Sequence, residues 1–220
     1  MDLVANLERV RERIATAGGD VEHVGILAVT KGHGIDAVRA ALAAGLLDIG
    51  ENYAQELAAK ADELGDTAAA PRWHFIGQLQ RNKVRQVAHL VHLWQSVDRL
   101  RLGEEIVKRS PGASVLVEVN LTDDPNRGGT RPGLVPGLVD GLRDLGLQVR
   151  GLMAVGVTGT PGDVRAGFRT VRTLADELGL PERSMGMSGD LELAVEEGST
   201  MVRVGSALFG PRFPSPAVEN

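Results

Sequence analysis

Lys31 is the residue best suited to covalent chemistry in this chain of 220 residues. It ends the uncharged run 26–30 and is followed by Gly32, His33 and Gly34. Apolar surroundings and a nearby cation lower the pKa of a lysine, and the neutral amine attacks an aldehyde. A lysine at a strand end is also commonly a surface residue whose ammonium reaches water. Both interpretations stay open for Lys31 alone.

Two serines near the C-terminus could bind phosphate. Ser188 lies in the segment MGMSGD, and Ser206 follows Gly205 in the segment VRVGSALFG. Glycine lets backbone N–H groups approach a phosphate without interference from a Cβ atom, and a serine hydroxyl adds a donor. Because glycine and serine are also common turn residues, either pair alone indicates only a turn. The two pairs together favour a phosphate site.

Arg203 alternates with apolar residues in the segment MVRVG, so it shares one strand face with Met201 and Gly205. A guanidinium on an inward face needs an anionic or acceptor partner. That partner is either a bound ligand or a carboxylate of the chain, Glu118 or Asp190.

The elements that would position these residues alternate between short apolar runs and helical patterns. Eight strands are predicted, over residues 25–31, 46–52, 72–77, 91–98, 114–121, 148–157, 183–189 and 200–210. Each of the first seven is followed by a helical segment, and no GxGxxG sequence follows the first strand. This α/β pattern predicts a single (β/α)8 TIM barrel rather than an open doubly wound sheet.

Two further features complete the predicted architecture. An extra N-terminal helix, with Leu7, Val10 and Ile14 on its apolar face, is expected to pack against one end of the barrel. In the segment WHFIG, Trp73 and His74 alternate, so one of them faces the interior. No linker divides the chain, and residues 1–220 are therefore predicted to form one domain.

In a (β/α)8 barrel the C-terminal ends of the strands form the functional face, and the loops after strands seven and eight commonly bind phosphate. Lys31, Ser188, Arg203 and Ser206 all fall at such ends, and the loop 122–133 follows the fifth strand onto the same face. An amine facing a phosphate cradle favours an aldehyde that carries a phosphate. Pyridoxal 5'-phosphate is such a molecule.

Several segments resemble, in order and spacing, the pyridoxal-phosphate homeostasis family, which has the fold of the alanine racemase N-terminal domain. They are LAVTKGHG, DIGENYAQE, WHFIGQLQRNK, GLMAVG and SMGMSGDLELAVEEGSTMVRVGSALFG, and the match covers nearly the whole chain. The resemblance implies a fold type III barrel that binds pyridoxal 5'-phosphate as a Schiff base on Lys31. It also implies a pocket lined by Asn52, a phosphate held by Ser188, Gly205 and Ser206, and a cofactor contact from Arg203, at either the ring nitrogen or the phosphate.

The loops depart from the family pattern. After the reactive lysine the family commonly has a polar residue, a second lysine and a proline, where this chain has Gly32, His33 and Gly34. Gln78 stands where the family usually has a proline. Arg127, Gly128 and Gly129 stand where the family usually has Lys-Ser-Gly. These differences predict a more flexible loop after Lys31 and do not change the assignment of Lys31.

The absence of an export signal predicts a cytoplasmic protein. We expect it to hold and deliver pyridoxal phosphate, and the resemblance implies effects on amino-acid and keto-acid balance. PLP-dependent apoenzymes are the implied partners, and we expect a monomer without sustained turnover. The alternative is a PLP-dependent amino-acid racemase or a related fold type III enzyme. Such racemases use a second domain and a tyrosine from a partner subunit. The only tyrosine here is Tyr53, so a second base would have to be His33 or His74.

Composition argues against several other classes. Cysteine is absent, which excludes disulfides, thiolate catalysis and cysteine-ligated metals. The net charge of −5 and the aromatic content of 3% disfavour nucleic-acid binding. No apolar run approaches the roughly 20 residues of a membrane-spanning helix, and residues 1–16 do not resemble an export signal. His89 and His92 have no accompanying carboxylate, so no metal site is predicted.

Overall fold

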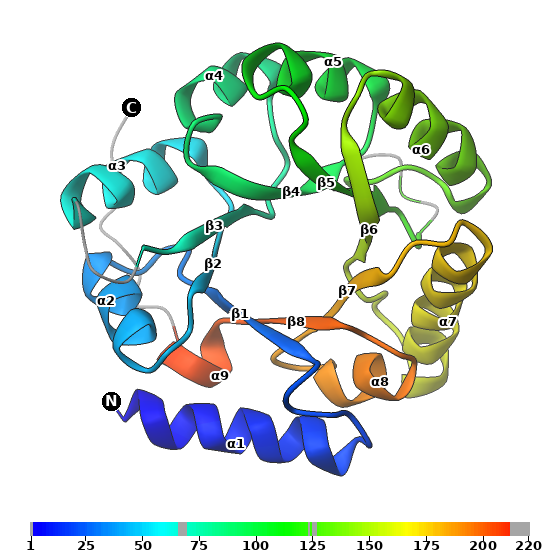
Figure 1. Ribbon diagram of the computed structural model, residues 1–220. Coiled ribbons are helices and arrows are strands. Elements are labelled where there is room, and N and C mark those ends of the chain that lie inside the picture. Colours follow the sequence, from blue (N-terminus) through cyan, green and yellow to red (C-terminus); the bar gives the residue numbers. More distant parts are fainter. Residues whose placement is uncertain (1, 66–69, 123, 125–126, 212–220) are drawn as a thin grey trace.

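The computed structural model describes residues 2–65, 70–122, 124 and 127–211. Eight parallel strands, β1 to β8, pair in sequence order, and β8 pairs with β1 to close a barrel. Figure 1, which looks along the barrel, shows the ring of strands with the helices outside it. The prediction of a (β/α)8 barrel is confirmed.

The strands lie close to their predicted positions. They are β1 (Gly25–Val29), β2 (Asp48–Glu51), β3 (Arg72–Phe75), β4 (Val91–Val97), β5 (Ser114–Val119), β6 (Gln148–Ala154), β7 (Glu182–Met187) and β8 (Met201–Val204). The predicted strand 200–210 is in fact β8 followed by a short helix, because the chain turns at Gly205.

The helices follow the predicted periodicities. They are α1 (Leu3–Thr16), α2 (Ile35–Ala43), α3 (Ala54–Leu64), α4 (Val84–Val87), α5 (Leu100–Arg109), α6 (Val135–Asp144), α7 (Pro161–Glu177), α8 (Leu191–Glu196) and α9 (Ser206–Phe209). Short 3-10 turns precede α4 and α6, at Arg81–Lys83 and Pro132–Leu134. None of the described helices is both long and apolar enough to cross a bilayer.

The outer faces of the strands and the inner faces of the helices share one continuous apolar core. Trp73, Phe75, Trp94 and Val204 of the strands pack in this core with helix residues such as Phe168. Burying a large apolar side chain contributes roughly 1.5–3 kcal/mol relative to leaving it exposed. This layer therefore fixes the strands, and with them the residues at their ends.

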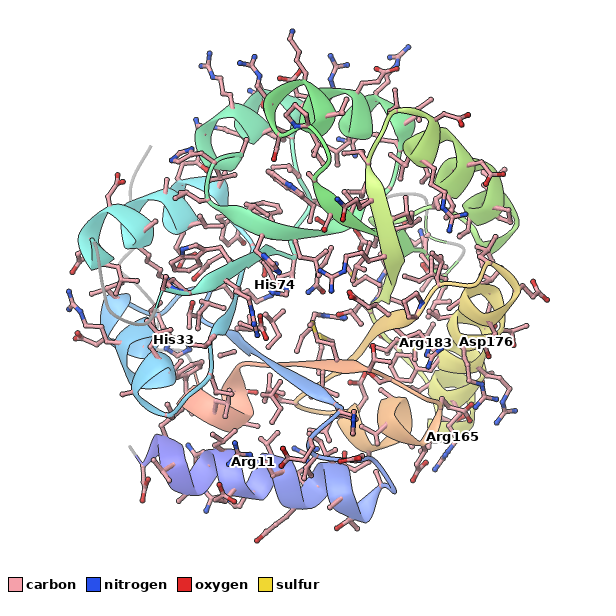
Figure 2. All side chains as sticks on the ribbon, in the orientation of Figure 1. Arg11, His33, His74, Arg165, Asp176 and Arg183 are labelled. Atoms are coloured by element: carbon pink, nitrogen blue, oxygen red, sulfur yellow. The ribbon has the colours of Figure 1, made fainter. Side chains whose placement is uncertain are left out.

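The interior of the barrel is more polar than this outer layer. His74, Gln95, Glu118, Ser184 and Arg203 are all buried, with exposed fractions between 0 and 9%. Ser184 on β7 donates a hydrogen bond to Gln95 on β4, across the barrel, so both side chains point inward. Figure 2 shows His74 inside the ring of strands. Of the two neighbours in WHFIG, His74 is therefore the interior residue.

The N-terminal helix does not cover an end of the barrel. In Figure 1, α1 lies outside the ring, alongside α8 and α9. Leu7, Val10 and Ile14 are buried, as their spacing predicts, but against the flank formed by these helices. The Asn6 side chain also donates to the carbonyl of Leu208 at the end of α9, at 2.6 Å. The prediction of an end-on position was wrong, because the chain between α1 and β1 turns along the side of the barrel.

Candidate cofactor site

A cavity of about 280 Å³ lies at the C-terminal ends of β1, β7 and β8. Its volume is close to the lower limit of small-molecule sites, which span roughly 300–1,000 Å³. The residues that line it are Val29, Lys31, His33, Ile76, Met187, Ser188, Gly189, Arg203, Gly205 and Ser206. Five of the six predicted site residues therefore share one cavity: Lys31, Ser188, Arg203, Gly205 and Ser206.

The backbone on both sides of Lys31 is bonded to one ion-pair network. Lys60 Nζ donates to the carbonyl of Thr30 at 2.8 Å, to Glu51 Oε1 at 2.6 Å and to Glu56 Oε1 at 2.9 Å. The same Glu56 oxygen accepts the N–H of Gly32 at 2.6 Å. Lys31 thus stands between two residues that are both tied to α3.

This network is buried, and burial sets its electrostatics. Lys60 is 5% exposed and Glu51 is fully buried, with Thr30 donating a further hydrogen bond to Glu51. Burial raises the pKa of the Glu51 carboxyl, and the Lys60 ammonium offsets only part of that rise. Three hydrogen bonds use the three N–H groups of a charged Lys60. The sequence analysis missed this network, although Glu56 and Lys60 are four residues apart on a predicted helix, the spacing of a helical ion pair.

The loop after Lys31 is shaped by its glycines. Gly32 has a φ of +71°, which only glycine adopts readily. The N–H of His33 donates to the carbonyl of Thr30 at 3.0 Å, which closes a tight turn. The His33 ring then packs against Phe209, with ring centroids 5.4 Å apart. His33 therefore forms a wall of the cavity.

The opposite wall is made by the loops after β7 and β8. Asp190 Oδ1 accepts the N–H of Met187 at 2.6 Å, and Ser188 Oγ accepts the N–H of Ala207 at 3.2 Å. The first bond closes the β7 loop on itself, and the second ties this loop to the start of α9. A Cβ atom at Gly205 would lie 3.2 Å from the carbonyl oxygen of Val29, so a glycine allows β8 to approach the end of β1 closely.

The helix α1 also holds this wall, which the sequence analysis did not anticipate. Arg13 donates to the carbonyl of Ser188 at 3.0 Å. The same guanidinium makes two hydrogen bonds to Glu192, at 2.5 and 2.8 Å. An N-terminal helix that is separate from the barrel repeat therefore reaches the loop on which Ser188 stands.

Arg203 is 4% exposed and points into the barrel, as the alternation predicts. Its partners are neither of the two carboxylates considered from the sequence. Its guanidinium donates to the carbonyl of Ser184 at 2.5 Å, to Ser184 Oγ at 2.9 Å and to the carbonyl of Ala154 at 2.7 Å. Burial lowers the pKa of Arg203 to about 10, against the opposing effect of Glu118 and Asp190. At neutral pH the guanidinium is still charged.

Glu118 is a second titratable group near this end of the barrel. Burial raises its pKa to about 7, and Asp98 adds to the rise, while Arg203 and Arg127 oppose it. Glu118 does not line the cavity of Lys31. Its proton occupancy nevertheless changes near neutral pH, so it sets the net charge beside Arg203.

Asn52 lines a neighbouring hollow instead of the cavity of Lys31. This hollow, of about 810 Å³, is also lined by Tyr53, Gln78, Arg127 and other residues of the β2 to β5 loops. Asn52 Oδ1 is buried and has no hydrogen-bond partner among the described residues. The described part of loop 122–133 does lie at this mouth, as predicted, while residues 123, 125 and 126 lie outside the described residues.

Comparisons with known proteins agree with this geometry. The family model of the alanine racemase N-terminal domain matches residues 2–213. The pyridoxal phosphate homeostasis protein of Pseudomonas aeruginosa is 42% identical over 218 residues, which cover 95% of this chain and 94% of that protein. The chain belongs to the pyridoxal phosphate homeostasis protein family. The Escherichia coli (strain K12) homeostasis protein is 36% identical over 231 residues, which cover 96% of this chain and 97% of that protein.

Solved structures extend the comparison from the homeostasis protein family to its fold. PipY of Synechococcus elongatus, determined with PLP bound, matches with a TM-score of 0.84 at 35% identity, covering 95% of this chain and 100% of PipY. An alanine racemase from Clostridium difficile matches with a TM-score of 0.72 at 16% identity and covers 97% of this chain, which spans 57% of the racemase. The racemase likeness shows the shared barrel fold alone.

Proposed function

We propose that this chain is a pyridoxal 5'-phosphate carrier that acts in PLP homeostasis. It holds the cofactor on Lys31, releases or delivers it to PLP-dependent apoenzymes, and so affects amino-acid and keto-acid balance. In this proposal residues 1–220 work as one domain, as a monomer in the cytoplasm. The names of its curated relatives and the PLP-bound PipY structure support it. The observation that carries it is the shared cavity of Lys31, Ser188, Arg203, Gly205 and Ser206.

The residues present fit this cofactor. Lys31 supplies the amine, while Ser188, Gly205 and Ser206 supply the small, donor-rich wall that a phosphate needs. The unpartnered Oδ1 of Asn52, in the neighbouring hollow, is an acceptor that suits a donor from a ligand at the same mouth. When bound, pyridoxal phosphate supplies an aldehyde that condenses reversibly with a lysine amine, with loss of water.

The chain's own residues give the carrier its reversibility. Lys60 and Glu56 fix the backbone at Thr30 and Gly32, so the point from which the Lys31 side chain extends is set by α3. Arg203 stays charged at neutral pH and adds a fixed positive charge on the barrel side of the cavity. The cavity opens at the barrel mouth, where the cofactor can enter and leave.

The positions of the candidate second bases favour the carrier over a racemase. Tyr53 is 64% exposed and lines the neighbouring hollow. His74 is buried and bonded to Asp48 and Gln95, away from the cavity of Lys31. Of the three candidates only His33 lines that cavity, and it does so packed against Phe209. A two-base racemase therefore depends on His33 alone.

The test is cofactor attachment followed by a search for turnover. The purified protein mixed with pyridoxal phosphate is expected to gain a visible absorbance band, and borohydride reduction is expected to fix a mass increment on Lys31. Lys31→Ala should lose both signals. Lys83→Ala is the matched control, because Lys83 is a lysine at the same mouth but in the neighbouring hollow. A protein that gains neither band nor mass increment would overturn the proposal.

Turnover distinguishes the carrier from the alternative. The loaded protein is incubated with single amino acids, and the products are separated by chiral chromatography. We expect no sustained racemisation. Racemisation that continues over many cycles, and that is lost in both Lys31→Ala and His33→Ala, would favour a racemase and contradict the carrier.

A further inference from the structure

A chain of hydrogen bonds crosses the barrel interior from Arg203 to the N-terminal end of β2. Arg203 donates to Ser184 Oγ at 2.9 Å, and the Ser184 hydroxyl donates to Gln95 Oε1 at 2.7 Å. Gln95 Nε2 then contacts His74 Nδ1 at 2.7 Å, and His74 Nε2 contacts Asp48 Oδ1 at 3.0 Å. Four strands besides β8 contribute one member each: β7, β4, β3 and β2.

The direction of donation along this chain is fixed by its surroundings. Gln95 Nε2 also donates to Met201 Sδ at 3.2 Å, and a thioether can only accept, so the amide nitrogen is on the His74 side. His74 Nδ1 therefore accepts, and His74 Nε2–H donates to Asp48. Every link donates in the same sense, from the cationic Arg203 to the anionic Asp48. Successive bonds of this kind polarise one another.

The chain is buried from Arg203 to His74. Gln95 is fully buried, and Ser184, His74 and Arg203 are 1%, 2% and 4% exposed. Barrel interiors are ordinarily filled by branched apolar residues, and a buried polar group is costly unless its partners are present. Leu93, Leu116 and Met153 fill part of this interior in the ordinary way. Apolar residues occur in the same interior, and what distinguishes the polar members is their hydrogen-bonded connection to Arg203.

The chain also joins the two ends of the barrel. At the C-terminal end of the barrel, its first member, Arg203, lines the cavity of Lys31. Asp48, His74 and Ser184 line a separate cavity of about 370 Å³ at the N-terminal end. Arg72 closes the chain there with two hydrogen bonds to Asp48, at 2.6 and 2.7 Å.

We propose that Gln95 and His74 are positioning residues for Arg203. Gln95 Oε1 accepts a hydrogen bond from the Ser184 hydroxyl, and this turns the lone pairs of the Ser184 oxygen toward Arg203. The guanidinium is thereby fixed against β6 and β7. His74, held by Asp48, fixes the Gln95 amide. The orientation of the charge that faces the cofactor is therefore set by residues from the far end of the barrel. This inference rests on the proposed function only for the cofactor contact of Arg203.

The central variant is Gln95→Met, which keeps the length of the side chain and removes both polar atoms. Removing a hydrogen bond that supports a charged group weakens binding by roughly tenfold, so the Kd for pyridoxal phosphate should rise about tenfold and the visible band should shift. In the apoprotein, the Arg203 side-chain N–H signals should exchange faster with water, measured by NMR and assigned through their loss in Arg203→Lys. Ser184→Ala should reproduce both effects.

The double variant Gln95→Met with Ser184→Ala separates positioning from packing. If Gln95 acts through Ser184, the double variant is no worse than Ser184→Ala in cofactor affinity and in N–H exchange, because interacting sites are non-additive. Additive losses would overturn the proposal. Met153→Leu is the control, since it changes packing in the same interior and should leave both signals unchanged.

A conservative variant guards against a folding defect. In either protonation state of its carboxyl, Gln95→Glu keeps an acceptor for Ser184 and a hydrogen bond to His74, so both signals should stay near those of the unaltered protein. If Gln95→Met fails to fold, Asp48→Asn at the half-buried far end gives the same test, with an expected faster N–H exchange and a smaller rise in Kd. Unaltered Arg203 exchange in every variant refutes the inference. The exchange measurement needs no cofactor, so failure of the proposed function is seen separately, as absent binding in the unaltered protein.

Discussion

Lys31 and Arg203 line the same cavity but are held in opposite ways. Around Lys31, the network of Lys60 bonds to the backbone of the flanking residues Thr30 and Gly32. On the Arg203 side, the guanidinium itself donates the hydrogen bonds, to both oxygens of Ser184 and to the carbonyl of Ala154. The first arrangement fixes where a side chain starts, and the second fixes where a side chain ends.

The difference corresponds to two kinds of task. An amine that forms and breaks a bond has to move between states, and the bonds to the flanking backbone set where its side chain begins. A charge that only stabilises a ligand works best when it is oriented before the ligand arrives. The proposed carrier needs both. The predictions below disturb one side of the cavity at a time.

Lys60→Met should have the largest effect, on the Lys31 side. It leaves the fully buried Glu51 without its cation, and breaking a buried ion pair costs about 3–5 kcal/mol in the free energy of unfolding. Cofactor attachment should also slow, because the carbonyl of Thr30 loses the Lys60 donor and keeps only the His33 N–H among the described residues. Urea unfolding and the growth of the visible band measure the two effects.

The double variant Lys60→Met with Glu51→Gln serves as its control. It removes the uncompensated carboxylate, so the free energy of unfolding should recover in part, while attachment should stay slow. Equal stability of the single and double variants would contradict a cost that arises from the stranded charge of Glu51.

Glu118 gives a pH test of the Arg203 side. Its pKa is raised to about 7 in the folded protein from an ordinary 4.5, so the folded state binds more protons between these values. The stability that this group contributes is fully present below pH 4.5 and is lost as the pH rises through 7. The change is on the order of 3 kcal/mol for a shift of this size in a buried group.

Glu118→Gln should remove most of this dependence. The variant should be more stable than the unaltered protein at pH 8 and close to it at pH 4.5, measured by urea unfolding across this range. The charged groups that act on Glu118 are Asp98, Arg203 and Arg127, and these are unchanged in the variant. If the free energy of unfolding of Glu118→Gln keeps its full dependence on pH, a group other than Glu118 causes that dependence.

The barrel and most of the cavity could be predicted from the sequence, because both depend on local pattern. The alternation of apolar runs with helical patterns predicted the strands. Within the segment MVRVG, the alternation of side chains predicted that Arg203 faces inward, as it does in the structure. The rule that functional groups stand at C-terminal strand ends then selected Lys31, Ser188, Gly205 and Ser206. The structure gathers these residues around one cavity.

The partners of these residues could not be predicted, because they depend on register across the barrel. Ser184 and Gln95 are 89 residues apart in sequence, and only the closed ring brings them together. The same reason left Trp73 and His74 unassigned. Asn52, which directly follows β2, was expected in the cofactor pocket. It lines the neighbouring hollow, among loops whose paths no periodicity describes.

Glu56→Ala should have a moderate effect on the Lys31 side. It removes the acceptor of the Gly32 N–H and one partner of Lys60, and we expect a loss of about 1–2 kcal/mol, since this carboxylate is partly exposed. Cofactor release should accelerate, measured by transfer of the cofactor to an apoenzyme in excess. Glu56→Gln keeps an acceptor for the Gly32 N–H, so its rate of cofactor release should lie between those of the unaltered protein and Glu56→Ala. Identical release rates in all three proteins would mean that the Gly32 bond does not aim Lys31.

Arg13→Ala should have the smallest effect and the most local one. The Arg13–Glu192 pair is partly exposed, and such pairs contribute about 0.2–1 kcal/mol, so the free energy of unfolding should fall only slightly. The variant also frees the Ser188 carbonyl, so the affinity for inorganic phosphate, as a probe of this wall, should fall more than stability does. Arg11→Ala is the control and should leave phosphate affinity unchanged, because Arg11 lies on the same helix and, in the described part of the chain, pairs only with Glu8 at the surface. Equal phosphate affinity in both variants would show that α1 supports the fold without shaping the wall on which Ser188 stands.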